Sequence, residues 1–338
     1  MPLSLGGTIL QPGVAPIPRN RGWIECEAEV CARRNDSAKR DTAHARDWHG
    51  CDIVSPIVVN ILRIGRYRVL NHLGGGGSAE VYAAEDTLLH RKVALKVLRG
   101  DADDQQVRRF EREARLASLL NHPNVVTLYD IGHEGELQYI ITELIEGETL
   151  RERMERGPMT VMEVVEIASA AAGALAAAHE AWLVHRDVKP ENIAIRKDGV
   201  VKVLDFGVSA LCGDGDATDP LRRPGSLVGT LPYLSPEQVR GEPIIDNRSD
   251  IYSFGVVLYE MLSGHVPFSG GSVMDVLAQI VEREPDPLPA LIHWKLRDLV
   301  MTALRKNLYD RPQTMSQILA TLTDVRLELQ IRERGRTA

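Results

Sequence analysis

The chain has 338 residues, 44% hydrophobic and 26% charged, which is the balance of an ordinary globular protein with room for two lobes or domains. Its net charge of −7 argues against a nucleic-acid-binding surface spread over the whole chain. The four cysteines form no disulfide framework, no apolar stretch reaches the length of a membrane span and no secretory signal opens the chain, so the expected compartment is the cytoplasm.

Residues 1–64 form an amino-terminal extension that is rich in Gly, Pro, Arg and Asp and shows little periodicity. We expect it to be disordered or poorly packed. A zinc-finger spacing is matched by Cys26, Cys31, His44 and His49. Asn35 and Asp41, however, occupy the positions where such a finger places apolar core residues, so a leader without zinc is the preferred interpretation. A coding start placed upstream of the true one would also explain the segment, since the next Met is Met154.

From residue 65 the pattern tightens into short segments typical of strands. Five are expected, at Tyr67–Leu70, Glu80–Ala84, Val93–Val97, Val125–Tyr129 and Gln138–Glu143. One main helix is expected over Gln105–Asn121, ended by Pro123. Beyond Gly147 the pattern is mostly helical, beginning with the alanine-rich Val161–Ala181. The expected fold class is α+β, with a small antiparallel sheet followed by a larger helical lobe and no internal repeats.

Four consecutive glycines, Gly74–Gly77, connect the first two expected strands. Glycine lets backbone N–H groups approach phosphate oxygens without an intervening Cβ. The glycines alone are equally compatible with a flexible hairpin tip. The interpretation therefore depends on what lies near them in the fold.

Lys96 lies on the third expected strand, which is otherwise apolar, although a lone strand lysine is usually an edge or surface residue. A lysine that binds nucleotide phosphates is held by a helical glutamate. We assign that partner to Glu113, because Glu111 lies two positions earlier, about 200° around the helix.

The strongest chemical signal is the run His185–Asn192, followed by Asp205–Gly207. Asp187 can orient a hydroxyl group or accept its proton. Lys189 can offset the charge of a transferred phosphoryl group, and Asn192 and Asp205 offer the oxygen ligands that Mg²⁺ prefers. A tripeptide recurs by chance, but an ordered run of eight residues does not.

Residues from about 65 to 325 resemble the Ser/Thr protein kinase domain, most closely the bacterial eukaryotic-like (Hanks-type) kinases. Further segments that resemble these kinases are Glu80–Tyr82, Glu113–Ala114, Tyr233–Gln238 and Gly255–Met261. The resemblance implies a two-lobed fold with an N-lobe at 65–143, a hinge at 143–147 and a C-lobe at 148–325, followed by a charged tail at 326–338. Two positions depart from the family pattern: Ala79 replaces the third glycine, and Ser235 stands where Ala is usual.

The same resemblance implies an ATP site. Adenine would hydrogen-bond the backbone of Glu143 and Ile145 in the hinge. The phosphate and base contacts implied are Gly74, Gly75, Gly76, Gly77 and Lys96 for the phosphates, Val81 and Ala94 above the base, and Ala194 below it. Thr142 would gate the space behind adenine. Because Thr142 and Ala194 are small, we expect a roomier pocket than usual.

The function implied is transfer of the ATP γ-phosphoryl group to Ser/Thr hydroxyls of protein substrates, with Mg²⁺, or Mn²⁺ in its place, as the metal. Lys189 together with Thr230 favours Ser/Thr over Tyr acceptors. The loop from Asp205 to Glu237 would be autophosphorylated, which dimerisation would allow, and Arg186 would pair with the phosphate. The candidate acceptors in this loop are Thr218, Ser226 and Thr230. Family resemblance also implies a buried Glu237–Arg311 ion pair and an Asp250 that braces the catalytic loop.

Two alternatives remain open. A pseudokinase acting as a scaffold or nucleotide-dependent binding module is disfavoured because all the chemical groups named above are present. A small-molecule phosphotransferase is disfavoured because Gly229–Glu237 resembles the platform that binds protein substrates. Since the chain ends soon after its last expected helix, regulatory input is expected from a partner, the extension or phosphorylation.

Overall fold

The computed structural model describes residues 63–75, 79–98, 114, 118, 120–135, 137–206, 231–243 and 245–337. Several predictions fall outside these residues: the Cys/His spacing of the extension, Gly76 and Gly77, Glu113, most of the helix expected over 105–121, and the loop acceptors Thr218, Ser226 and Thr230.

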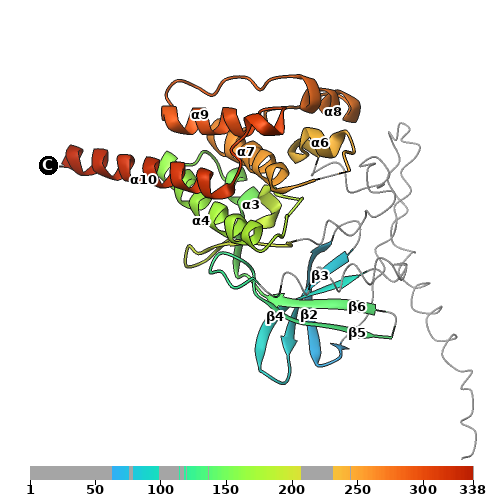
Figure 1. The fold of residues 1–338 in the computed structure, drawn as a ribbon. Coiled ribbons are helices and arrows are strands. Elements are labelled where there is room, and N and C mark those ends of the chain that lie inside the picture. The colour runs from blue at the N-terminus through green and yellow to red at the C-terminus, as the bar shows by residue number, and fades with distance from the viewer. Residues whose placement is uncertain are drawn as a thin grey trace, which may run out of the picture. The chain divides into compact units, whose positions relative to one another are not determined.

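The N-lobe is a six-stranded antiparallel sheet (Figure 1). Its strands, in spatial order, are β1 (Arg63–Ile64), β2 (Tyr67–Gly75), β3 (Ala79–Asp86), β4 (Arg91–Leu98), β6 (Leu137–Glu143) and β5 (Leu128–Glu134). Four of the five expected strands are confirmed at β2, β3, β4 and β6. The sheet also begins two residues before the boundary drawn at residue 65, because Ile64 pairs with Tyr67.

The strand expected over Val125–Tyr129 was misplaced, since β5 starts at Leu128. Val125 instead forms a parallel bridge with Val203, and the Val126 N–H donates to the Val203 carbonyl at 3.0 Å. Backbone groups that pair with a strand of the helical lobe cannot also pair within the N-lobe sheet. An apolar segment indicates a strand but does not specify its partner.

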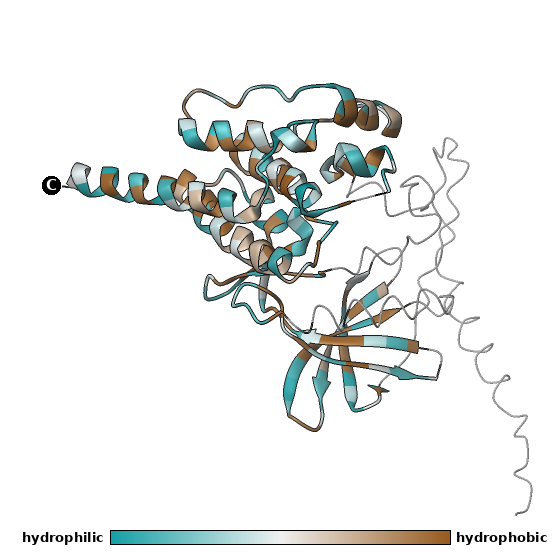
Figure 2. Ribbon diagram, viewed as in Figure 1, coloured by the Kyte–Doolittle hydropathy of each residue, from teal (hydrophilic) through white to brown (hydrophobic). Residues whose placement is uncertain are grey.

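Strand β4 positions Lys96, the lysine expected to bind nucleotide phosphates, through its two-residue alternation. Val93, Leu95 and Val97 are buried in the core of the N-lobe. Ala94 and Lys96 lie between them and are half-buried, so they belong to the opposite face of the sheet. Figure 2 shows the same alternation of hydrophilic and hydrophobic residues along the N-lobe strands.

The C-lobe combines a three-stranded sheet with helices, which confirms the expected α+β kinase architecture. The sheet consists of β7 (Gly147–Thr149), β8 (Ile193–Arg196) and β9 (Val201–Val203). The helices are α3 (Leu150–Glu155), α4 (Val161–Glu180), α6 (Pro236–Val239), α7 (Asn247–Ser263), α8 (Val273–Glu282), α9 (Trp294–Ala303) and α10 (Met315–Thr337), with 3₁₀ turns η1 (Pro190–Asn192), η4 (Leu231–Tyr233) and η5 (Leu308–Asp310). Helix α10 continues through the segment assigned to a separate charged tail, so no break in the backbone marks residue 325.

Helix α7 runs through the middle of the C-lobe core, and most of its side chains are buried (Figure 1). The Asp246 side chain caps its first turn, and Gly264, in the left-handed region at φ 81°, ends it. A Cβ on Gly255 would lie 2.9 Å from the Cβ of Ala303 on α9. Glycine at this position therefore allows the two helices to approach closely.

The sequence was expected to contain no apolar stretch as long as a membrane span. Helix α4 differs from that expectation, because its length and apolar composition would suffice to cross a membrane. Ten of its residues, among them Val165, Ala171 and Leu175, are buried in the protein. It also packs against α10 and α7. This packing is that of a core helix, which passes the same test of length and composition.

Candidate active site

The expected catalytic loop, His185–Asn192, is held by a buried carboxylate on α7. Asp250 accepts hydrogen bonds from the backbone N–H groups of His185 and Arg186, each at 2.7 Å, and from His179 Nε2 at 2.8 Å. Arg186 adopts the left-handed conformation at φ 66°, which is unfavourable for a residue with a side chain. The bonds to Asp250 hold this turn in place, as the family resemblance implied.

The His185 ring joins the catalytic loop to the segment that carries Asp205. Its Nε2 lies 2.8 Å from the Leu204 carbonyl, its Nδ1 lies 3.3 Å from the Asp187 N–H, and the ring packs 4.8 Å from that of Phe206. Because a donor faces Nδ1 and an acceptor faces Nε2, these partners assign the proton to Nε2. Sequence reasoning gave His185 no separate role.

The proposed base, Asp187, lies between two donors. Lys189 Nζ is 2.8 Å from Asp187 Oδ2, and Asn192 Nδ2 donates to the same oxygen at 3.0 Å. Asn192 Nδ2 also donates to the Asp187 backbone carbonyl at 2.8 Å. The carboxylate is therefore fixed in orientation, with an ammonium group beside the place where a phosphoryl group would meet the acceptor.

The structure brings together Lys96 of the N-lobe and Asp205 of the C-lobe. Lys96 Nζ lies 2.9 Å from Asp205 Oδ1. Burial alone would raise the pKa of Asp205, but the Lys96 ammonium, aided by His185 and Lys189, outweighs it and holds that pKa below its ordinary value. Asp205 is therefore ionised near neutral pH, as a metal-binding carboxylate must be.

Asp205 and Asn192 have the donor chemistry of a magnesium site. The Leu204 N–H donates to the Asn192 carbonyl at 2.8 Å, which ties the two segments together. Since the Asn192 amide nitrogen is bound to Asp187, its amide oxygen is the group available to a hard cation. The described residues contain no group of three or more His, Cys, Asp and Glu able to hold a metal. A cation that takes its remaining ligands from phosphates and water needs no such group.

The residues expected around the nucleotide come from neighbouring strands. In the sheet register Val81 pairs with Lys96 and Ala94 pairs with Thr142, while Ala194 lies on β8 of the lower lobe. The Glu143 N–H donates to the Thr127 carbonyl at 2.8 Å. Among the described residues, the Glu143 carbonyl accepts only a long contact from the Thr142 hydroxyl, at 3.4 Å, so it is the backbone group of this residue that an expected adenine base would meet.

The start of the glycine-rich hairpin favours glycine at one described position. Gly74 has a φ of 153°, outside the range that side chains favour. Gly75 lies beside the Glu80 carboxylate on the neighbouring strand, a flexible group that could move aside for a Cβ. The described part of the hairpin is consistent with a loop that brings its backbone close to a ligand.

The loop from Asp205 to Glu237, the expected activation loop, is anchored at its end by the ion pair that the resemblance implied. Arg311 Nη1 and Nη2 lie 2.7 and 2.8 Å from the two oxygens of Glu237. Ser249 Oγ donates to Glu237 at 2.5 Å. Ser235, the departure from the family pattern, caps α6 by accepting from the Gln238 N–H at 3.4 Å.

Comparison with known proteins identifies the family of this chain. The family described as protein kinase domain matches residues 67–322. The chain belongs to the protein kinase family. It is 39% identical over 267 residues to the serine/threonine-protein kinase PrkC of Bacillus subtilis, an alignment that covers 76% of this chain and 40% of the relative.

Two further relatives have similar sequence identity to this chain. The serine/threonine-protein kinase PknB of Mycobacterium tuberculosis is 43% identical over 270 residues, covering 77% of this chain and 43% of the relative. The serine/threonine-protein kinase pkn2 of Myxococcus xanthus is 41% identical over 268 residues, covering 76% and 32%. The chain thus spans well under half the length of the curated relatives it matches.

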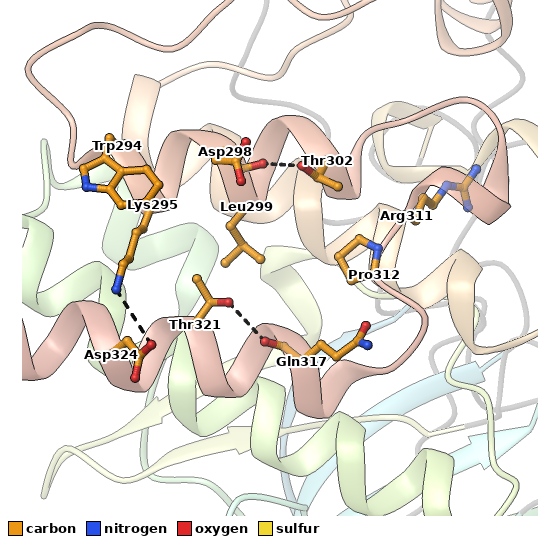
Figure 3. Close-up of a pocket in the computed structure, with 10 residues that line it drawn as sticks. All are labelled: Trp294, Lys295, Asp298, Leu299, Thr302, Arg311, Pro312, Gln317, Thr321 and Asp324. Atoms are coloured by element: carbon orange, nitrogen blue, oxygen red, sulfur yellow. Dashed lines mark hydrogen bonds and ion pairs between the residues drawn. The ribbon is translucent and has the colours of Figure 1, made fainter.

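A groove of about 440 Å³ lies between α9 and α10 of this kinase domain. Figure 3 shows the residues that line it. None of the expected catalytic or nucleotide-binding residues lines it. Of the two cations that line it, Arg311 is paired with Glu237, and Lys295 lies 2.7 Å from Glu328 and 3.7 Å from Asp324. The groove is therefore separate from the chemistry described above, and we assign it no role.

Proposed function

We propose that this chain is an ATP-dependent serine/threonine protein kinase that transfers the γ-phosphoryl group of ATP to hydroxyl groups of protein substrates. The observation that carries the proposal is the pair of contacts Lys189–Asp187, at 2.8 Å, and Lys96–Asp205, at 2.9 Å. The first joins a candidate base to a cation. The second joins a candidate metal ligand to a candidate phosphate ligand.

In this mechanism Asp187 orients the acceptor hydroxyl and receives its proton as the oxygen attacks the γ-phosphorus. Asn192 keeps the carboxylate aimed at the acceptor. Lys189 offsets the negative charge on the transferring phosphoryl oxygens, and Lys96 holds the remaining phosphates. Asn192 and Asp205 would hold Mg²⁺, or Mn²⁺ in its place, which when bound neutralises and orients the phosphate groups.

Serine and threonine are proposed as acceptors on two grounds. The relatives named above are serine/threonine-protein kinases by name. Lys189, two residues after the base, suits hydroxyls on short side chains, and its ammonium group reaches Asp187. Thr230, which together with Lys189 favours Ser/Thr acceptors, lies outside the described residues.

Autophosphorylation of the activation loop is proposed as the means of control, with Thr218, Ser226 and Thr230 as candidate acceptors and Arg186 as the partner of the phosphate. Transient dimerisation would bring one loop to the active site of a second copy. The expected compartment is the cytoplasm, with protein substrates and no nucleic-acid partner. Intact-mass analysis after incubation with MgATP tests loop phosphorylation. A mass without any added phosphate would contradict this proposal.

The deciding experiment measures transfer of labelled γ-phosphate from MgATP to the protein itself and to a generic basic protein. Label in the wild type that disappears in Asp187→Asn would establish kinase chemistry and the role of this carboxylate. Absence of label in both proteins, with nucleotide binding intact, would favour the scaffold alternative.

A further inference from the structure

A buried lysine near the hinge has no role in the mechanism above. Lys202 lies on β9, three residues before Asp205, and only 7% of it is exposed. Its Nζ is 2.8 Å from Glu143 Oε2 and 3.3 Å from the Val125 carbonyl. Lysine is almost never buried unless its charge is paired, so Glu143 is what allows the cation to occupy this position.

Glu143 is in turn held at several points. Its Oε2 also accepts from the N–H and the hydroxyl of Thr127, each at 3.4 Å, and its Oε1 lies 3.5 Å from Arg196. Its backbone N–H donates to the Thr127 carbonyl. In the part of the chain that the structure describes, the Glu143 carbonyl itself accepts only from the Thr142 hydroxyl, at 3.4 Å. Lys202, with the shortest contact, and Thr127 therefore hold the side chain and the N–H of the residue that bears this carbonyl, whereas Arg196 is the most distant of its partners.

Lys202 also stands beside the expected floor of the adenine pocket. In the β8–β9 register Lys202 lies directly opposite Ala194. Opposed residues of antiparallel strands have side chains on the same face of the sheet. One buried cation therefore adjoins the floor of the pocket, contacts the hinge and sits on the strand that leads to Asp205.

We propose that Lys202 is a positioning residue for recognition of the nucleotide base. Through its ion pair it fixes Glu143 so that the backbone carbonyl faces the 6-amino group of adenine. Lys202 itself does not touch the nucleotide. The inference rests on the proposed function, because it requires ATP to bind at the hinge.

The physical basis is the angular dependence of a hydrogen bond, which weakens steeply as the donor moves out of line. Without Lys202, the Glu143 carboxylate loses its shortest contact with a cation and turns toward water, and the hinge peptide loses its fixed direction. Only a base that donates a hydrogen bond to that carbonyl senses the change. A base without the amino group does not.

The experiment compares two nucleotides on the same proteins. Dissociation constants for MgATP and for the magnesium complex of purine riboside 5′-triphosphate, which lacks the 6-amino group, are measured calorimetrically for wild type and Lys202→Met. We expect ATP binding to weaken by about 3- to 10-fold, the value of one hydrogen bond, with binding of the other nucleotide unchanged. Lys202→Arg, which keeps the cation, should restore most of the preference for ATP.

Arg196→Met is the matched control, because it removes a cation from the same carboxylate while leaving Lys202 in place. Arg196 contacts Glu143 at 3.5 Å but binds Asp198 at 2.5 Å, so the preference for ATP should not change. If Lys202→Met does not fold, Glu143→Gln removes the same charge pair and must show the same selective loss.

Equal weakening of both nucleotides, or no change in either, would overturn the inference, because a purely structural lysine does not distinguish the two bases. Wild-type protein that binds neither nucleotide would overturn the proposed function and this inference with it. Wild-type protein that binds both, with a ratio that Lys202→Met leaves unaltered, would overturn the inference alone.

Discussion

The guanidinium of Arg311 donates hydrogen bonds to both oxygens of the Glu237 carboxylate, and the two side chains are 0% and 3% exposed. Burial would raise the pKa of Glu237, but Arg311 outweighs it and holds that pKa below its ordinary value. Arg311 also donates to the carbonyls of Arg248, Arg305 and Lys306. The pair therefore joins the end of the loop from Asp205 to Glu237 to the turn that precedes α10.

Replacing Arg311 with Met should strongly destabilise the kinase domain. The change leaves the Glu237 carboxylate buried without its cation, which costs about 3–5 kcal/mol of the free energy of unfolding. Urea unfolding followed by tryptophan fluorescence measures the loss. Arg240→Met is the control, since its pair with Glu242 at 3.5 Å is on the surface and should be worth about 0.5 kcal/mol or less. A loss for Arg311→Met no larger than that of the control would contradict the prediction.

Asp250→Asn should impair phosphoryl transfer more than folding. An amide nitrogen at this position would face the N–H of His185 or Arg186, and two donors cannot bond to each other. The left-handed turn at Arg186 would relax and displace Asp187. We expect kcat to fall by about 100-fold, while KM for ATP changes little.

Steady-state kinetics on wild type and Asp250→Asn test this expectation, with Asp275→Asn as control because Asp275 is exposed on α8. A variant with wild-type kcat would show that the turn at Arg186 holds without the carboxylate.

Lys306 should make the stability of the C-lobe depend on pH. Its Nζ donates to the Ile280 carbonyl at 2.8 Å, near the end of α8, and lies 3.9 Å from the centroid of the Phe268 ring. Burial lowers its pKa from 10.5 to about 8, although Glu284 opposes this. Between these two values the unfolded chain binds more protons than the folded one, so the contribution of Lys306 to stability rises with pH.

A comparison of wild type with Lys306→Met isolates the pH-dependent contribution of Lys306 to stability. Met keeps an unbranched apolar stem at this position. The free energy of unfolding of wild type, minus that of the variant, should increase by up to about 1.4 kcal/mol per pH unit from about pH 8 to 10. Urea midpoints across that range supply the measurement. A difference that stays constant as the pH rises would mean that the lysine keeps its ordinary pKa, and one that falls would mean that folding raises that pKa.

Thr142→Met should exclude bulky inhibitors from the nucleotide site. Thr142 pairs with Ala94 across β4 and β6, so two small side chains lie next to each other at the back of the expected adenine pocket. A longer side chain there overpacks the space, at a cost of about 1–3 kcal/mol to a ligand that must occupy it. Inhibitors with large substituents should therefore bind wild type at least about tenfold more tightly.

The affinity for ADP controls for general damage, since adenine itself does not extend behind Thr142. Equal affinity of wild type and Thr142→Met for the bulky inhibitors, with ADP binding unchanged, would show that the space behind adenine is closed in both.

Local patterns in the chain were sufficient for much of the fold. The alternation at Val93–Val97 and the alanine-rich Val161–Ala181 correspond to β4 and α4, because the backbone geometry of a strand or helix sets the spacing of buried residues. The same patterns could not distinguish a core helix from a membrane span at α4. That distinction depends on what the helix packs against.

The sequence by itself determined which residues could perform the chemistry, since Asp187, Asn192 and Asp205 are recognisable from their order and spacing. Only the tertiary structure decided which groups meet: Lys202 with Glu143, His179 with Asp250, and Val125 with Val203. Lys202 and Glu143 are separated by 59 positions and His179 and Asp250 by 71, and no local period relates them. They are chosen by packing across the whole domain, where a buried charge or backbone group must find a partner.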